Sequence, residues 1–238
     1  MDTVSIAIET SCRAGGLALG CGEAVTATIE FDASARHATH LVTQLKELLD
    51  KAGLSPADLS ELYISAGPGS FTGLRVGITV ARTMAQALPR VRCVAVPTPQ
   101  AVAENARCLS WEHLAVVLDA REGQVHASLF ERNGQQIVSS SVPPRLYRPE
   151  EFLSAAPRPL LLIGEGLGYH EPFASALRPA GPGAERAPLP PEVTLAPAEL
   201  NLPGARGVWA VGRRMAAAGQ FVPWAQLLPV YVRNPFGT

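Results

Sequence analysis

The sequence twice places an acidic residue directly after an apolar, strand-like run, once after residues 4–8 and again after residues 114–118. The two segments read Glu9-Thr10-Ser11 and Asp119-Ala120-Arg121. A carboxylate at the end of a strand can organise magnesium, and small residues in the following turn let backbone N–H groups approach phosphate. The two turns are therefore predicted to be the halves of a nucleotide site, facing each other.

Both copies depart from the pattern that this chemistry requires. A working site of this kind has an aspartate followed by glycine and Ser or Thr. Glu9 is one methylene longer than aspartate, and neither acid is followed directly by glycine. Arg121 could neutralise Asp119 within its own turn, without any phosphate. We therefore expect a degenerate nucleotide site: binding of ATP or ADP with magnesium stays open, and phosphoryl transfer is not expected.

A glycine-rich run joins a predicted strand, residues 62–66, to a predicted helix that extends to Leu88. It reads Gly67-Pro68-Gly69-Ser70-Phe71-Thr72-Gly73. Backbone N–H groups at a helix N-terminus can bind an anion. However, no lysine follows the last glycine, as a Walker A loop requires, and the spacing differs from the dinucleotide fingerprint. The preferred alternative is that the glycines permit positive φ angles and close packing of the helix.

The remaining histidines, cysteines and Ser70 do not form a complete metal site or catalytic site. His37 and His40 are three positions apart on a predicted helix, but no third metal ligand accompanies them, so no metal site is assigned. Ser70 does not lie in a nucleophile elbow, and no catalytic residue is assigned. Three histidines are isolated in the sequence and four cysteines show no metal or redox spacing. They are His113, His126 and His170, and Cys12, Cys21, Cys93 and Cys108.

The elements that position these residues recur along the chain. The order strand, acidic residue, turn, strand, turn, strand occurs twice, with the acids 110 positions apart. This spacing is too long for a solenoid repeat and predicts two homologous lobes. The pattern is typical of an α/β fold of the actin-like ATPase (ASKHA) class, with two duplicated ribonuclease H-like lobes. We assign residues 1–108 to the first lobe and residues 109–238 to a second, reduced lobe.

Composition restricts the function classes. The chain has 238 residues and a formal net charge of −1, which argues against a protein that grips nucleic acid by itself. No apolar run approaches the roughly 18 residues of a membrane span, and no signal peptide is evident. A cytoplasmic location is expected.

Five ordered segments carry a resemblance to a known family. The most specific is residues 67–77, and the others read Ile6-Ala-Ile-Glu-Thr-Ser11, Arg36-His-Ala-Thr-His-Leu41, Leu118-Asp-Ala-Arg121 and Pro229-Val-Tyr-Val-Arg233. In these segments the chain resembles the TsaB (YeaZ) family. The resemblance is dense over residues 1–130 and sparse from about residue 140 to 225. Glu9 is a departure, since many members have aspartate there.

The resemblance implies a non-catalytic role. The family comprises cytoplasmic paralogues of TsaD, the subunit that transfers the threonylcarbamoyl group to the adenosine next to the tRNA anticodon. Its members lack the histidine metal motif of TsaD and serve as its dimerisation partner. An ATPase, TsaE, joins the complex, and tRNA is reached only through it. Isolated members form homodimers through a similar surface, and ATP or ADP with magnesium at the subunit interface remains an open alternative.

Carried onto this chain, the resemblance places the interface on the helices of residues 36–49 and 71–88, which would form a four-helix bundle with the matching pair of the partner. The expected interface residues are His37, His40, Leu41, Gln44, Leu45, Leu48, Phe71, Leu74, Arg75 and Ile78. The alternative is that the apolar members of this set pack on the sheet of their own lobe.

Two other functions remain as alternatives. The first is an ATP-dependent small-molecule kinase of the same superfold, against which the two altered acidic turns argue. The second is a peptidase, because the family was once grouped with glycoproteases. Ser70 is its candidate nucleophile, but no complete hydrolytic site supports it.

Overall fold

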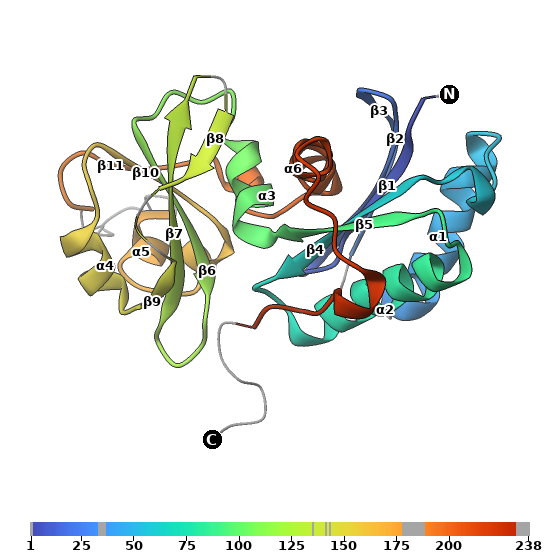
Figure 1. The fold of residues 1–238 in the computed structure, drawn as a ribbon. Coiled ribbons are helices and arrows are strands. Elements are labelled where there is room, and N and C mark those ends of the chain that lie inside the picture. The colour runs from blue at the N-terminus through green and yellow to red at the C-terminus, as the bar shows by residue number, and fades with distance from the viewer. Residues whose placement is uncertain are drawn as a thin grey trace. The chain divides into compact units, whose positions relative to one another are not determined.

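The computed structural model describes residues 2–32, 37–134, 136–140, 142, 144–177 and 189–231. The chain is α/β and divides into two compact units (Figure 1). Unit 1 comprises Met1–Ala101 and Pro203–Thr238, and unit 2 comprises Val102–Leu202. In the part of the chain that the structure describes, no helix has the length and apolar character needed to cross a membrane.

Unit 1 is built on a five-stranded sheet in the order β3-β2-β1-β4-β5. Its strands are β1 (Val4–Glu9), β2 (Ala14–Cys21), β3 (Ala24–Asp32), β4 (Glu61–Gly67) and β5 (Arg92–Pro97). The first three strands form an antiparallel meander, and β4 and β5 run parallel to β1. Short turns suffice within the meander, whereas each parallel connection needs a crossover helix.

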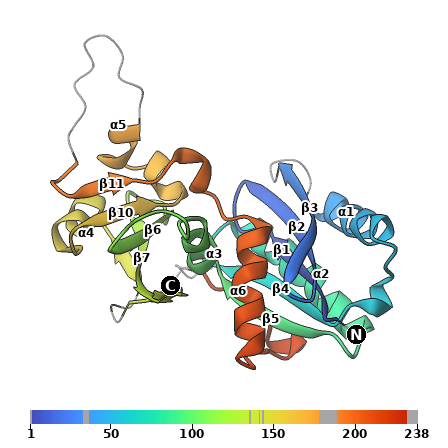
Figure 2. The same cartoon turned by 90° about the horizontal axis from the view of Figure 1, so that it is seen from above.

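Helices cover both faces of this sheet (Figures 1 and 2). The helices α1 (His37–Lys51) and α2 (Phe71–Ala87) pack on the face that carries Ile6 and Ile8. The helix α6 (Ala205–Ala217) packs on the opposite face, which carries Ala7. The alternation along β1 follows from the two-residue period of a strand. A short helix, η1 (Pro56–Asp58), precedes β4.

Unit 2 is built on a six-stranded sheet whose main path runs β11-β10-β6-β7-β8, with β9 paired to β7. Its strands are β6 (His113–Asp119), β7 (Val125–Asn133), β8 (Gln136–Ser139), β9 (Arg145–Tyr147), β10 (Leu160–Ile163) and β11 (Val193–Leu195). Its helices are α4 (Pro149–Ala155), η2 (Glu165–Gly168), α5 (Phe173–Leu177) and η3 (Ala198–Leu200). The helix α3 (Thr98–Asn105) begins in unit 1 and ends in unit 2.

The two sheets have the same topology, which confirms the predicted duplication. In each, a three-stranded antiparallel meander is followed by two strands parallel to the first, on its other side. Unit 2 is the reduced copy: α1 and α2 have 15 and 17 residues, whereas α4 and α5 have 7 and 5. Its helices therefore cover less of their sheet.

The units differ from the lobes assigned on the sequence in two respects: unit 2 begins at Val102 instead of residue 109, and the C-terminal segment belongs with unit 1. The indole N–H of Trp209 on α6 donates to the Ser5 hydroxyl on β1 (2.9 Å). A Cβ at Gly20 or Gly212 would lie within 2.5 Å of the rings of Trp209 or Tyr63, so α6 lies very close to the sheet. The first lobe thus includes α6.

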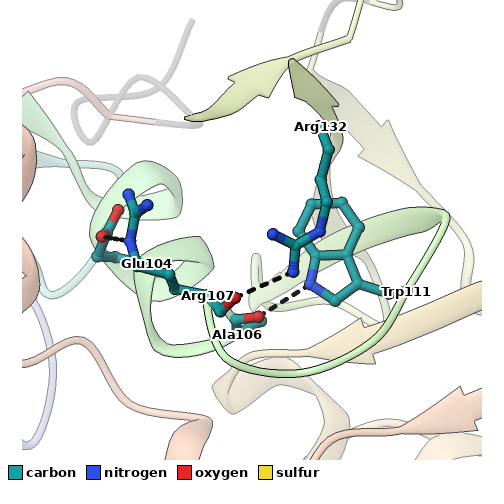
Figure 3. A network of polar contacts seen from close by, with 5 residues as sticks. All are labelled: Glu104, Ala106, Arg107, Trp111 and Arg132. Carbon is teal, nitrogen blue, oxygen red and sulfur yellow. Dashed lines mark hydrogen bonds and ion pairs between the residues drawn. The ribbon is translucent and has the colours of Figure 1, made fainter. Parts of the chain in front are cut away.

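A polar network ends α3 and fixes the chain that leads into β6 (Figure 3). The indole N–H of Trp111 donates to the carbonyl of Ala106 (2.9 Å). The guanidinium of Arg132, on β7, donates to the carbonyls of Arg107 (3.0 Å) and Leu109 (2.7 Å) and lies 4.3 Å from the Trp111 ring centre. The three carbonyls belong to the turn that follows α3, so these contacts fix that turn.

Candidate functional site

The first acidic turn closes on itself. Glu9, Thr10 and Ser11 at the end of β1 are fully buried. One carboxylate oxygen of Glu9 accepts the backbone N–H of Ser11 (2.5 Å) and its hydroxyl (2.6 Å). The carboxylate therefore stabilises the turn that follows it and is shielded from solvent.

The start of α2 lies directly against this turn, and the glycine run makes that possible. The N–H of Ser70 donates to the carbonyl of Ser11 (2.6 Å). A Cβ at Gly69 would lie 2.3 Å from that same carbonyl oxygen, and one at Gly73 would lie 1.9 Å from the carbonyl oxygen of Thr10. Gly67 has a φ of +108°, which L-residues rarely adopt. Close packing and positive φ, the preferred interpretation of the run, are confirmed.

In unit 1, several groups expected to hold a magnesium nucleotide make hydrogen bonds within the chain. The carboxylate that should hold magnesium is buried and bonded to Ser11. Two N–H groups at the start of α2 are also engaged: that of Ser70 by Ser11, and that of Gly73 by the Ser70 hydroxyl (3.2 Å). A phosphate would have to displace these bonds. The Ser70 hydroxyl acts as the N-cap of α2, a structural role.

The second acidic turn is stabilised differently. Oδ1 of Asp119 accepts the backbone N–H of Arg121 (2.9 Å) and lies 2.8 Å from Nε2 of His170. Arg121 therefore contacts Asp119 through its backbone N–H, whereas the sequence had suggested a contact through its guanidinium. Arg121 and the next two residues have φ of 60°, 51° and 72°, so the turn is left-handed throughout.

Sequence reasoning missed His170, which lies 51 positions from Asp119. The parallel pairing of β6 with β10 brings the loop after β10 across the end of β6. A Cβ at Gly166 in this loop would lie 2.8 Å from the carbonyl carbon of Leu118, and Gly164 has a φ of +125°. The loop thus repeats in unit 2 the close approach that the glycine run makes in unit 1. Only the topology could have identified this histidine.

The two acidic turns belong to different units, Glu9 to unit 1 and Asp119 to unit 2. That they face each other stays a prediction. Within the described ranges, no three or more His, Cys, Asp or Glu side chains are grouped so that they could hold a metal ion. His37 opens α1, but its side chain lies outside what the structure describes, and His40 is exposed.

The structure corrects half of the expected helical interface. Five of its residues are at most 6% exposed and belong to the hydrophobic core between the helices and the sheet of unit 1. They are Leu41, Leu45 and Leu48 on α1 and Leu74 and Ile78 on α2. They point toward the sheet because their 3- and 4-residue spacing puts them on one helical face. The alternative stated from the sequence, packing on their own lobe, applies to all five.

Of the other expected residues, His40 and Arg75 are exposed, and Gln44 and Phe71 are half-buried. Besides His40 and Arg75, the surface that α1 and α2 turn to solvent contains side chains that were not expected at the interface. We call this second group the outer helical face, and it comprises Thr43, Glu47 and Asp50 on α1 and Thr72, Thr79 and Thr83 on α2. Val42, 54% exposed, borders it. Short side chains on α2 allow another helix to approach closely.

Comparison with known proteins gives a consistent result. Residues 31–167, more than half of the chain, match the family described as "TsaD: tRNA N6-adenosine threonylcarbamoyltransferase". The chain is 28% identical to a Bacillus subtilis protein over 90% of this chain and 95% of the relative. It is also 28% identical to an Escherichia coli protein, over 96% of this chain and 94% of the relative. Both relatives are named tRNA threonylcarbamoyladenosine biosynthesis protein TsaB.

The fold of a solved structure agrees with these relationships. The structure of YeaZ from Pseudomonas aeruginosa superimposes with a TM-score of 0.77 at 26% sequence identity. The superposition covers 96% of this chain and 99% of that one.

Proposed function

This chain belongs to the TsaB (YeaZ) family, and we propose that it is a non-catalytic scaffold in the formation of threonylcarbamoyladenosine in tRNA. The observation that carries the proposal is the match to the Bacillus subtilis TsaB protein over nearly the whole of both chains. A match of this extent includes both units, so the role does not rest on one shared domain.

The proposed partner is a TsaD-like paralogue that binds the outer helical face. The family description that matches the chain is that of the threonylcarbamoyltransferase itself, which supports a common ancestry of the two proteins. Two paralogues with the same helix pair can associate as a four-helix bundle. The contact then depends on exposed residues such as Thr72, Thr79 and Thr83, and not on the buried leucines.

A scaffold role agrees with the chemistry of the acidic turns. Glu9 is buried and bonded within its own turn, and Asp119 contacts His170 and the main chain of Arg121. The Ser70 hydroxyl is an N-cap, which argues against the peptidase alternative. The turns act as structural elements in this proposal, and the transferase chemistry belongs to the partner.

The remaining assembly is proposed on the same basis. A TsaE-like ATPase joins the pair, and tRNA is bound only through the complex. The chain alone forms a homodimer through the outer helical face, which the paralogue displaces. A nucleotide at the subunit interface is then held chiefly by groups of the partner.

Binding of the purified TsaD-like paralogue, measured by isothermal titration calorimetry, tests this proposal. Leu74 is unsuitable for substitution, because it is fully buried and a charge there would unfold unit 1. Thr79→Arg instead adds bulk and charge on the exposed side of α2. We expect it to weaken the complex at least tenfold, about 1.4 kcal/mol.

Thr3→Arg is the matched control, since Thr3 is also exposed in unit 1 but lies ahead of β1, outside the two helices. It should bind the paralogue as the unchanged chain does. Equal affinity of Thr79→Arg and Thr3→Arg for the paralogue would exclude the outer helical face as the interface.

A further inference from the structure

A C-terminal strap, residues 222–231, runs along one flank of α2 in unit 1 (Figure 1). It includes the short helix η4 (Trp224–Gln226). The N–H of Val222 donates to the carbonyl of Cys93 (2.9 Å), and that of Val230 to the carbonyl of Ala66 (2.7 Å). Leu227, between them, is fully buried in the core of unit 1. The strap is therefore anchored at both ends and in its middle.

Three side chains of the strap are apolar and exposed: Trp224 by 38%, Leu228 by 58% and Val230 by 57%. Elsewhere in the described ranges, large hydrophobic side chains of comparable exposure lie singly on separate elements. Single exposed apolar residues are ordinary, but a group of them within seven positions indicates an interaction surface.

Two arginines border this apolar group. The guanidinium of Arg75 lies 5.1 Å from the ring centre of Phe71, and that of Arg82 lies 5.9 Å from the ring centre of Trp224. Phe71 in turn contacts Tyr231 of the strap, with ring centres 5.2 Å apart. A guanidinium stacked on a ring keeps its N–H groups in a fixed plane, ready to bind a carboxylate.

The positive charge of Arg75 and Arg82 is not balanced by acidic residues on the same elements. Neither α2 nor the strap contains an acidic residue, although the chain as a whole carries a net charge of −1. Among the residues that the structure describes, the ion pairs of arginine involve Arg92, Arg107 and Arg213, and none of them includes Arg75 or Arg82. The flank thus combines apolar area with positive charge that no carboxylate of the described residues neutralises.

Nucleic acid fits this surface less well than protein does. Bases would need free aromatic faces to stack on, whereas Arg75 already lies over Phe71 and Arg82 over Trp224. Leu228 and Val230 offer aliphatic surface, which suits apolar side chains and not phosphate or ribose.

We propose that the strap and the adjoining flank of α2 bind a partner-protein segment that combines apolar with acidic side chains. Its apolar side chains pack on Trp224, Leu228 and Val230, and its carboxylates accept hydrogen bonds from Arg75 and Arg82. The strap lies outside the outer helical face, but Arg75 and Phe71 were also expected at the paralogue interface, so in that part the inference rests on the proposed function.

Peptide binding to the full chain, followed by fluorescence anisotropy, tests the inference. The probes are three labelled peptides of equal length: one of leucine and glutamate, one of leucine and lysine, and one of serine and glutamate. We expect the leucine–glutamate peptide to bind at least about tenfold more tightly than either of the others. The double variants Arg75→Ala/Arg82→Ala and Leu228→Ser/Val230→Ser should each remove this preference.

Arg145→Ala is the matched control. Arg145 is also an exposed arginine stacked on an aromatic ring, 4.5 Å from the centre of Tyr147, but it lies in unit 2. Its loss should leave peptide affinity unchanged. Thermal unfolding verifies that the double variants keep their fold, and Arg82→Gln alone serves as a milder substitute if one of them does not.

Three results would overturn the inference. One is equal affinity for the three peptides, and another is a preference that persists in both double variants. The third is binding of unmodified tRNA, in place of the leucine–glutamate peptide, that is lost in Arg75→Ala/Arg82→Ala. That result would assign the surface to nucleic acid.

Discussion

Gly73 has a specific structural role, although it lies within a helix, where glycine is normally unfavourable. Alanine in a helix interior is usually more stable than glycine by about 1 kcal/mol. At this position, however, a Cβ would lie 1.9 Å from the carbonyl oxygen of Thr10. Relief of that clash requires α2 to move away from the acidic turn of unit 1.

Gly73→Ala is therefore expected to lower the free energy of unfolding by about 3 kcal/mol, the upper range for overpacking. The control is Gly168→Ala, because nothing lies within 4 Å of a Cβ at Gly168. Chemical denaturation of both variants measures the difference. A stability of Gly73→Ala equal to or above that of the unchanged chain would contradict the close approach of α2.

His126 gives unit 2 a pH-dependent stability. Burial lowers the pKa of His126 from its usual value, because the charged imidazolium loses solvation in the folded chain. The unfolded chain takes up a proton near pH 6.5, whereas the folded chain does so only at lower pH. Above about pH 6.5 His126 is neutral in both states and does not reduce the free energy of unfolding. As the pH falls below this value, the unfolded chain binds a proton that the folded chain does not, and the free energy of unfolding decreases.

Between pH 7.5 and 5.5 we expect His126 to account for a loss of about 1 kcal/mol in unfolding free energy. Urea denaturation at the two pH values measures it. In His126→Leu the difference should shrink, whereas in His40→Gln, at an exposed position, it should persist. An unchanged pH dependence in His126→Leu would show that another group is responsible.

At the scale of elements, Arg132 connects β7 to the end of α3. It donates to the carbonyl of Arg107 and stacks on Trp111 (Figure 3). It also donates to the carbonyl of Leu109. Loss of a hydrogen bond that involves a charged group typically costs 1.5–3 kcal/mol when buried and less when exposed. The network therefore joins β7 to the turn after α3.

We expect Arg132→Ala to lower the unfolding free energy by about 1–2 kcal/mol, since it removes both hydrogen bonds and a cation–π contact. Arg145→Ala removes one cation–π contact and no hydrogen bond shown for Arg145, so its cost should be smaller. Thermal denaturation compares the two. A larger effect of Arg145→Ala would mean that stacking, and not carbonyl capping, dominates.

The sequence predicted the elements of unit 1 well, because local pattern determines them. The helices expected over residues 36–49 and 71–88 are observed as His37–Lys51 and Phe71–Ala87. The spacing of Leu41, Leu45 and Leu48 could not show whether they pack on the sheet of their own unit or on a partner protein, because an apolar stripe is compatible with both. The structure shows that these leucines are buried in the core of unit 1.

Contacts between distant segments were beyond sequence reasoning. The pairing of β10 with β6 brings His170 to Asp119. The helix α6 joins unit 1 through the Trp209–Ser5 hydrogen bond and through its buried apolar residues such as Val208. Neither contact has a local signal. The strap is similar: its motif was noted, but its packing on Phe71 and Arg82 was not predictable from spacing.

At the scale of the whole molecule, two copies of one sheet topology now carry different features. Unit 1 has long helices whose outer face is exposed, whereas unit 2 has short ones. In both units a glycine loop lies against the acidic turn at the end of the first strand. Duplication thus supplied two similar scaffolds, and the proposed binding function uses the helices of the first.

Reconstituted threonylcarbamoylation of tRNA, with the TsaD-like paralogue and the TsaE-like ATPase present, tests the central claim most directly. The claim is that this chain acts by binding and not by its own acidic groups. We predict that Thr79→Arg abolishes modification, whereas Asp119→Asn, which changes charge but little shape, supports it at the unchanged rate. Loss of modification in Asp119→Asn, with full activity of Thr79→Arg, would contradict the account.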